Sequence, residues 1–358
     1  MEKKVIILTA YAGHGKDFAL EQIKKIDKNY KKIAFADKFK EIIAKNLPNK
    51  VLSNFSDKMS PIEIVNELKD NRPDILISGN LNMRDFLRKM LGDTIREIEP
   101  DIHCLYTIKD IEKNLVKNPN TKFVCTDNRY VNEQDYLIQI NQYKNTSDIL
   151  DFIRYSIKEK ADSIDIIKAD KTLDKHFPEK DKFLKDIRTD FLKSINDLKM
   201  TEKPRDSFSI LKIKNINLNN ETLNSAFNKY GVVGIFRPLI PTDKNPTTKK
   251  ELFKEISKFT GLNFDEIEKI KEKYEKNCEL SFNLDNIKKY GFIRTSPFHL
   301  SESSLEAANR KPSSVILNIP DKTGTNLYNK ILDLLNNETL GLNLDNTSKK
   351  KHLKNKCS

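Results

Sequence analysis

The chain has no tryptophan and, among its 358 residues, only 10 glycines and 4 cysteines. The cysteines stand at positions 104, 125, 278 and 357, without a close pair or a metal-ligand spacing, which argues against a disulfide framework and structural zinc. No apolar run approaches the roughly 20 residues that a membrane-spanning helix needs. The absences favour a protein of a reducing cytoplasm with no membrane segment.

Charged residues, in contrast, make up 32% of the chain, and the formal net charge is +12. A positive field favours anionic partners, either nucleotides or nucleic acid. Most basic residues are interspersed with acidic ones, however, so solvated helix surfaces explain the charge equally well. The one local basic cluster, residues 349–356, lies in a basic tail over 341–358.

Five short apolar runs without polar alternation have the pattern of buried parallel strands. They occupy residues 5–8, 32–35, 122–125, 232–236 and 314–317. Helical patterns lie between them, for example over 18–28 and 326–336. Strands that alternate with helices predict an α/β fold with a five-stranded parallel sheet flanked by helices.

The spacing of these runs is uneven, and it predicts the domain organisation. Residues 126–231 separate the third run from the fourth, although a single crossover needs only about a dozen residues. We therefore expect a large, mostly helical insertion over 138–228, within a discontinuous core formed by 1–137 and 229–340. Inside that core, the charged stretch 241–290 is expected to form a helical lid.

The strongest chemical signal directly follows the first apolar run. It is the segment Ala10-Tyr11-Ala12-Gly13-His14-Gly15-Lys16-Asp17. Phosphate-binding loops have the pattern G-x-x-x-x-G-K-[ST], in which backbone N–H groups surround phosphate oxygens and the lysine reaches the outer phosphates. Gly15 and Lys16 match, whereas Ala10 replaces the first glycine and Asp17 replaces the hydroxyl residue that meets magnesium.

A glycine-containing turn with an exposed lysine is the alternative to a phosphate-binding loop. The preceding apolar strand and the following helical pattern favour nucleotide binding. The apolar run is also too short for a secretion signal, so secretion is not expected.

A second signal is Asp127, which follows the third apolar run. In P-loop enzymes, an aspartate at the end of a strand beside the loop holds magnesium or its water shell. Many strands end in aspartate, so Asp127 indicates a magnesium site only in combination with the phosphate-binding loop. The residues that follow, up to Glu133, are more distinctive.

Several segments resemble, in the same order, those of the deoxynucleoside monophosphate kinases of bacteriophages. Residues 15–17 are similar to the family's G-K-D loop, and 36–40 to its A-D-x-x-K segment. Residues 84–93 are similar to its R-x-x-L-Q-x-x-G-T block, 127–133 to D-x-R-F-x-N-E, 230–238 to a G-strand-R-P element and 299–302 to H-x-S-E. The resemblance spans 1–136 and 229–336.

This resemblance implies a P-loop NTPase fold and a kinase that transfers the ATP γ-phosphate to a deoxynucleoside monophosphate, with Mg²⁺ as cofactor. The acceptor phosphate is already ionised, so catalysis depends on alignment and charge neutralisation rather than on a strong base. The ATP-binding residues it implies are Tyr11, Ala12, Gly13, His14, Gly15, Lys16, Asp17 and Arg237.

The remaining site residues follow from the same resemblance. Asp17 and Asp127 would position magnesium, directly or through water. Arg84 would hold the acceptor phosphate, supported by Arg88 and Arg129, because guanidinium grips phosphate bidentately. Asp37 and Lys40 would line the acceptor pocket. For the arginines a surface ion pair is the alternative role, and for Asp37 and Lys40 it is helix capping.

Three residues depart from the family's pattern. Ala10 and Phe18 stand where relatives have Gly and Thr, and Arg88 stands where Gln is common. Ala10 weakens the expected phosphate contacts, so a catalytically silent scaffold stays an alternative. Arg88 is expected to affect which base is accepted.

Two other functions stay open. A kinase of another small metabolite fits because a fold does not fix a substrate. A nucleic-acid-binding P-loop protein is also possible, with the insertion and basic tail as its contact surface, but the chain shows no aromatic-basic stacking pattern. The expected partners are thus ATP and a nucleoside monophosphate, in the cytoplasm (of an infected host cell if the protein is viral), and a homodimer is left open.

Overall fold

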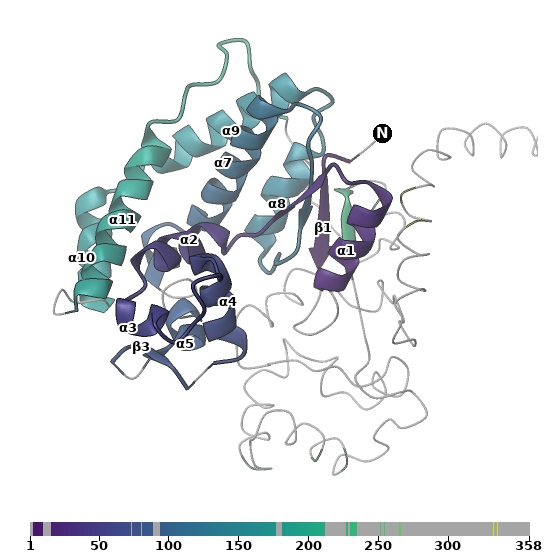
Figure 1. Ribbon diagram of the computed structural model, residues 1–358. Coiled ribbons are helices and arrows are strands. Elements are labelled where there is room, and N and C mark those ends of the chain that lie inside the picture. The colour runs from purple at the N-terminus through teal and green to yellow at the C-terminus, as the bar shows by residue number, and fades with distance from the viewer. Residues whose placement is uncertain are drawn as a thin grey trace, which may run out of the picture. The chain divides into compact units, whose positions relative to one another are not determined.

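The computed structural model describes residues 3–9, 16–72, 74–79, 81–88, 94–176, 181–211, 227 and 230–234, with single positions at 251, 254, 265, 332 and 335. Contacts divide the chain into two compact units. The sheet unit consists of Met1–Lys32, Asn120–Gln142 and Lys212–Ser358. The helical unit consists of Ile33–Pro119 and Tyr143–Leu211. Figure 1 labels the elements of both.

A parallel sheet forms the centre of the sheet unit. Its strands are β1 (Val5–Thr9), β2 (Tyr30–Ile33), β5 (Lys122–Cys125) and β6 (Val232–Gly234), in the order β2-β5-β1-β6. β1 pairs in parallel with β5, where Ile6 lies opposite Val124, and with β6, where Leu8 lies opposite Val233. The predicted α/β class with a parallel sheet flanked by helices is therefore confirmed, with four strands among the described residues.

The second strand differs from its predicted position. It was expected over 32–35 but is Tyr30–Ile33, with a turn before the next helix. That prediction was wrong because the buried Phe35 belongs to this turn, while two exposed lysines occupy the middle of the strand. The fifth expected strand, 314–317, lies outside the described residues.

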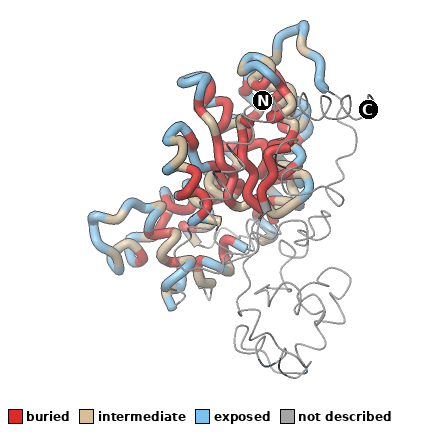
Figure 2. Tube along the Cα trace, turned by 90° about the vertical axis from the view of Figure 1, so that its right-hand side faces the viewer, coloured by how far each residue is buried: buried red, intermediate tan, exposed pale blue. Residues whose placement is uncertain are grey.

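Helices lie against both faces of this sheet. Because side chains alternate along a strand, Ile6 and Leu8 share one face of β1, and they pack with Ala19, Leu20 and Ile23 of α1 (Lys16–Ile26). α8 (Val131–Ile140) also contacts β1, and Figure 1 shows it on the other side of β1 from α1. β1 is buried along its whole length. Figure 2 draws the buried residues of the chain as a red tube.

The amino end of β1 is fixed by a buried amide. Asn141 Oδ1 accepts a hydrogen bond from Val5 N (2.9 Å), and its Nδ2 donates to Val5 O (2.8 Å) and Tyr230 O (2.9 Å). Gly231 lies against this amide with φ +78°, and a Cβ there would come within 2.5 Å of Asn141 Nδ2 and 2.6 Å of Val5 O. Only glycine fits this position, both for its backbone angle and for the space available.

The helical unit contains nine helices among its described residues, with a short antiparallel pair of strands, β3 (Leu76–Ser78) and β4 (Leu81–Asn82). The helices are α2 (Asp37–Asn46), α3 (Asn49–Leu52), α4 (Pro61–Asp70), α5 (Met83–Leu87), α6 (Ile95–Ile98), α7 (Ile102–Lys117), α9 (Thr146–Ala161), α10 (Ile166–His176) and α11 (Lys182–Lys199).

Local sequence signals account for several of these helix starts. Ser60 caps α4 in a capping box: Ser60 Oγ accepts from Glu63 N, and Glu63 Oε2 accepts from Ser60 N at 2.7 Å. Pro61 occupies the first helical position, where its missing N–H costs nothing. Asn145 caps α9 by accepting from Asp148 N at 2.9 Å.

The helices from the stretch expected as an insertion pack with earlier parts of the chain. α9 contacts α7, and α11 contacts both α9 and α2. Phe39 of α2 lies 5.6 Å from Phe191 of α11 and 5.5 Å from Tyr106 of α7, measured between ring centroids. Residues 143–211 and 33–119 thus share one core. Across the described ranges, every helix is too short or too polar to cross a lipid bilayer.

Candidate functional site

The carboxyl end of β1 leads into the segment expected to bind phosphate. β1 ends at Thr9, and α1 begins at Lys16. Between them, the predicted ATP-binding residues Tyr11, Ala12, Gly13, His14 and Gly15 lie outside the described residues, as does Arg237. Lys16 is half-buried in the first turn of α1, where the helix dipole favours an anion.

Asp17 follows Lys16 on the surface of α1. Its side chain is 84% exposed, and Oδ1 lies 3.7 Å from Lys32 Nζ at the end of β2. An exposed carboxylate of this kind reaches a metal ion more readily through water than directly. Its assignment as a magnesium ligand stays a prediction.

β5, the strand beside β1, leads to Asp127. The carboxylate is half-buried, with Oδ1 3.8 Å from Cys125 Sγ. Burial raises the pKa of the Cys125 thiol well above its ordinary value, and the negative charge of Asp127 adds to the shift. Cys125 is therefore a neutral core thiol, and Asp127 is the charged group at this strand end.

A buried amide ties the ends of β1 and β5 together. Asn128 Nδ2 donates to Thr9 Oγ1 at 2.9 Å, in a buried contact between residues 119 positions apart. Thr9 immediately precedes the expected phosphate-binding loop, and Asn128 immediately follows Asp127. The sequence predicted no role for this pair, and the only available signal was an asparagine next to a strand-end aspartate.

Glu133 shapes the turn that follows Asp127. Its Oε2 accepts hydrogen bonds from Arg129 N (2.7 Å) and Tyr130 N (3.0 Å) at the start of α8. The carboxylate satisfies backbone donors that a helix start leaves without partners. The glutamate of the D-x-R-F-x-N-E resemblance thus has a structural role here, and it fixes the backbone of Arg129. The expected role of the Arg129 guanidinium stays a prediction.

The connections of the sheet explain why β1 and β5 matter. From β1 the chain crosses through α1 to β2 at one edge, and from β5 it returns past β1 to β6 at the other edge. Right-handed crossovers in opposite directions place their helices on opposite faces. Parallel sheets bind ligands outside the carboxyl ends of adjacent strands whose connections run in opposite directions.

The predicted acceptor-binding residues belong to the helical unit. In α2, Lys40 Nζ lies 3.9 Å from Asp37 Oδ1. In α5, the side chain of Arg84 is 66% exposed; its Nε donates to Lys69 O at 3.2 Å, and its guanidinium lies 3.6 Å from Asp70. Arg88 is also exposed, 3.5 Å from Asp85. Among the described residues, the partners of both arginines lie at the surface, and their exposed guanidinium groups are accessible to an anion.

The predicted residues therefore fall into two groups. The sheet unit contains Lys16 and Asp17, in the first turn of α1 after β1, and Asp127 and Arg129, in the turn between β5 and α8. The helical unit contains Asp37, Lys40, Arg84 and Arg88, on α2 and at α5.

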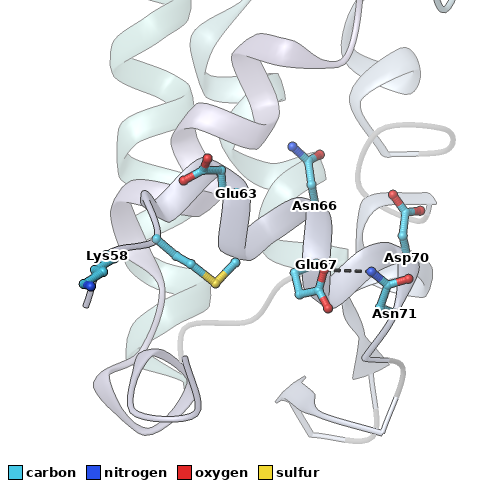
Figure 3. A pocket seen from close by; sticks show the side chains of 7 residues that line it. Lys58, Glu63, Asn66, Glu67, Asp70 and Asn71 are labelled. Carbon is cyan, nitrogen blue, oxygen red and sulfur yellow. Dashed lines mark hydrogen bonds between the residues drawn. The ribbon is translucent and has the colours of Figure 1, made fainter. Parts of the chain in front are cut away.

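An open hollow of about 410 Å³ lies on the helical unit beside α4, and the sequence did not predict it. Its lining residues are shown in Figure 3 and are Lys58, Met59, Glu63, Asn66, Glu67, Asp70 and Asn71. Several of the polar groups already have partners: Glu63 caps α4, Glu67 accepts from Asn71 Nδ2 at 2.7 Å, and Asp70 lies 3.1 Å from Lys69 Nζ. The hollow is thus a surface depression over a self-paired polar network.

The strand end at Asp127 is the position that best suits a metal ion. Among the residues that the structure describes, no group of three His, Cys, Asp or Glu side chains is arranged to hold an ion. Mg²⁺ bound with a nucleotide needs no such group, since one or two carboxylates, several waters and the phosphates complete its shell. Asp127, a half-buried carboxylate at a strand end, fits that pattern.

Comparisons of the chain with protein-family models, with curated proteins and with solved structures gave no match. The resemblance to the bacteriophage deoxynucleoside monophosphate kinases consequently rests on the short motifs and on the order in which they occur.

Proposed function

We propose that this chain is a P-loop kinase that transfers the γ-phosphate of ATP to a nucleoside monophosphate, with deoxynucleotides as the favoured acceptors. The observation that carries the proposal is the pairing of β1 with β5. It places the strand that leads to Lys16 beside the strand that leads to Asp127, with Thr9 and Asn128 in contact at 2.9 Å.

This geometry supports phosphoryl transfer because such a reaction requires aligned charges more than a chemical base. Lys16 lies at the positive end of α1, and in the proposal it meets the outer phosphates of ATP. Asp127 would hold the accompanying Mg²⁺ through its waters, and the ion would supply positive charge to the transferred phosphoryl group. The hydrogen bond from Arg129 N to Glu133 Oε2 fixes the backbone of Arg129, two residues after Asp127.

The proposal assigns Arg84 and Arg88 of the helical unit to the acceptor phosphate. Both are exposed, and their present partners are weak surface contacts that a phosphate dianion can replace. Asp37 and Lys40 are assigned to the acceptor's nucleoside. Arg237 is assigned to the ATP phosphates on the strength of the resemblance alone.

The test is an activity assay with purified full-length protein, ATP, Mg²⁺ and each ribo- and deoxynucleoside monophosphate in turn, followed by detection of ADP and the nucleoside diphosphate. Lys16→Ala is expected to lower kcat/KM by about a thousandfold, since it removes a charge that stabilises the transferred phosphoryl group. The matched control is Lys24→Ala in the last turn of the same helix, whose side chain is 40% exposed and lies 3.8 Å from Glu21.

The result is clear in either direction. Diphosphate formation that depends on Lys16 and not on Lys24 supports the proposal. Full activity of the Lys16 variant, or no turnover of any monophosphate by the parent protein, contradicts it. Transfer to a different phosphorylated or hydroxylated metabolite would instead favour the kinase with another acceptor.

A further inference from the structure

Asn128 is a buried residue whose hydrogen bonding is only half complete. Its side chain is 0% exposed. The Nδ2 atom donates to Thr9 Oγ1 at 2.9 Å and to Gln134 Oε1 at 3.3 Å. The Oδ1 atom is buried as well, and the described part of the chain offers it no hydrogen-bond donor.

An acceptor in this situation calls for an explanation. A buried carbonyl without a partner destabilises the folded state, and native proteins seldom retain one without a bound water, an ion or a functional reason. Reversing the amide does not remove the difficulty, because it would bring the Asn128 oxygen against Gln134 Oε1. With Gln134 in its present orientation, the Asn128 amide is placed with Oδ1 lacking a donor.

The location of Asn128 limits which kind of donor can bind its Oδ1 atom. Asn128 follows Asp127 directly and contacts the last residue of β1, at the carboxyl ends of the two strands that carry the proposed site. Phosphate oxygens of a nucleotide are acceptors and cannot satisfy a carbonyl. A water molecule bound to Mg²⁺ can, because the ion keeps several waters and polarises their O–H groups.

We propose that Asn128 is a positioning residue of the nucleotide site: its Oδ1 accepts a hydrogen bond from a water of the magnesium shell, while its Nδ2 holds the end of β1. The inference rests on the proposed function and deepens it. It makes one amide responsible for two tasks, since the same side chain fixes the strand before the loop and orients the hydrated ion beside Asp127.

The experiment measures ADP binding to the full-length protein by calorimetry over a series of Mg²⁺ concentrations, for the parent and three variants. Asn128→Leu has the same number of side-chain heavy atoms and the same branching but no polar atoms, and it is expected to raise the Mg²⁺ concentration at half-maximal effect about fivefold, the size of one lost hydrogen bond. Its affinity for metal-free ADP should change less than its Mg²⁺ midpoint, because Oδ1 takes no part in binding ADP without the ion.

Two further variants separate the two halves of the amide. Asn128→Asp keeps an acceptor at the Oδ1 position, so its Mg²⁺ midpoint should be equal to or lower than that of the parent. Thr9→Val removes one of the two partners of Nδ2 and leaves Oδ1 untouched; it should lower the melting temperature while leaving the Mg²⁺ midpoint where it was.

A purely structural asparagine, satisfied by a resident water, predicts a different pattern. Asn128→Leu would then lower the melting temperature without moving the Mg²⁺ midpoint, and that result overturns the inference. If Asn128→Leu does not fold, Asn128→Asp decides, because a raised midpoint in that variant contradicts the proposal. Failure of the parent protein to bind ADP at any Mg²⁺ concentration is distinct, and it removes the proposed function itself.

Discussion

The sheet unit and the helical unit are held by different kinds of polar contact. In the sheet unit, neutral amides reach across long sequence distances: Asn141 binds the backbone of Val5 and Tyr230, and Asn128 binds Thr9. In the helical unit, ion pairs join the helices, such as Arg154 with Glu112 and Arg188 with Asp170. The sheet unit has ion pairs as well, such as Lys122 with Asp27 at 2.6 Å, so the two units differ in emphasis.

The difference follows from what each architecture requires. Strand ends must meet at fixed distances, and an amide with both donor and acceptor can hold two backbone groups at once. Helices packed by their apolar faces need only general attraction along their solvated edges, which charges supply from a longer distance. We expect the sheet unit to be sensitive to small changes in shape and the helical unit to be sensitive to charge, pH and salt.

The largest expected effect comes from Gly231→Ala in the sheet unit. A Cβ at φ +78° would lie within 2.5 Å of Asn141 Nδ2 and 2.6 Å of Val5 O, so the backbone strain and the collision together should cost about 3 kcal/mol of unfolding free energy. Chemical denaturation measures the loss, and hydrogen exchange of β1 and β6 peptides should locate it in the sheet unit.

The matched control is Gly79→Ala in the helical unit. Gly79 also has a positive φ, +54°, but, apart from its chain neighbours, no heavy atom of the described residues lies within 4 Å of the point that the added methyl group would occupy, so only the backbone strain of about 1 kcal/mol applies. Equal losses of unfolding free energy in the two variants would show that close packing at Gly231 contributes nothing. The expectation that the sheet unit is the more sensitive to shape would then be wrong.

A smaller effect is expected from Arg154→Met in the helical unit. The Arg154 Nε–Glu112 Oε1 distance is 2.7 Å, and the Glu112 side chain is only 7% exposed. Removing the guanidinium leaves this carboxylate with Lys109 alone, at 2.6 Å, which should cost about 2 kcal/mol. Denaturation in low and high salt measures it, with Lys113→Met, whose pair with Asp110 is exposed, as the control.

Such a loss should appear in hydrogen exchange of α7 and α9 and leave β1 unaffected. An Arg154 variant as stable as the parent would mean that apolar packing alone holds these helices, and the proposed charge dependence of the helical unit would be wrong.

The smallest effect concerns acid. The hydrogen bond from Arg188, at 2.7 Å, and its positive charge lower the pKa of Asp170 against a smaller opposing effect of burial. A depressed carboxyl pKa stabilises the folded state above the unfolded value near 4, and this contribution disappears as the pH falls through the folded pKa. Because Asp170 is partly exposed, solvent screening keeps the contribution small.

Arg188→Met provides the comparison for this pH dependence. Urea midpoints of parent and variant should differ most near neutral pH and converge as the pH falls through the folded pKa of Asp170, where its carboxylate becomes protonated. A constant difference across that range would assign the effect of Arg188 to packing of its aliphatic stem and not to the ion pair.

Much of the sheet unit could be predicted from the sequence because its strands are continuous apolar runs. The run at 122–125 is the strand as found, and the runs at 5–8 and 232–236 begin where the strands begin. The second strand was misplaced because burial of Phe35 in a turn gives the same sequence signal as burial in a strand. Apolar pattern reports burial, and it does not distinguish the backbone conformation of short segments.

The contacts that shape the candidate site were less predictable. Lys16 and Asp127 carry local motifs, whereas the partners of Asn128 and Asn141 lie 119 and 136 residues away. Asparagine is common in this chain, and no local pattern distinguishes an amide that bridges two strands from one on the surface. Likewise, helical periodicity indicated the helices of residues 146–199 but not that they share a core with residues 33–119.

Both units are discontinuous in the chain, and this has a consequence for how the protein forms during synthesis. β1 leaves the ribosome well before its neighbours β5 and β6, which lie beyond roughly 110 and 220 residues of intervening chain, respectively. Until then, both edges of this mostly apolar strand have no permanent partner and can pair with other chains. A nascent chain that stalls after Gln142 would have acquired β5 but would still expose the edge reserved for β6.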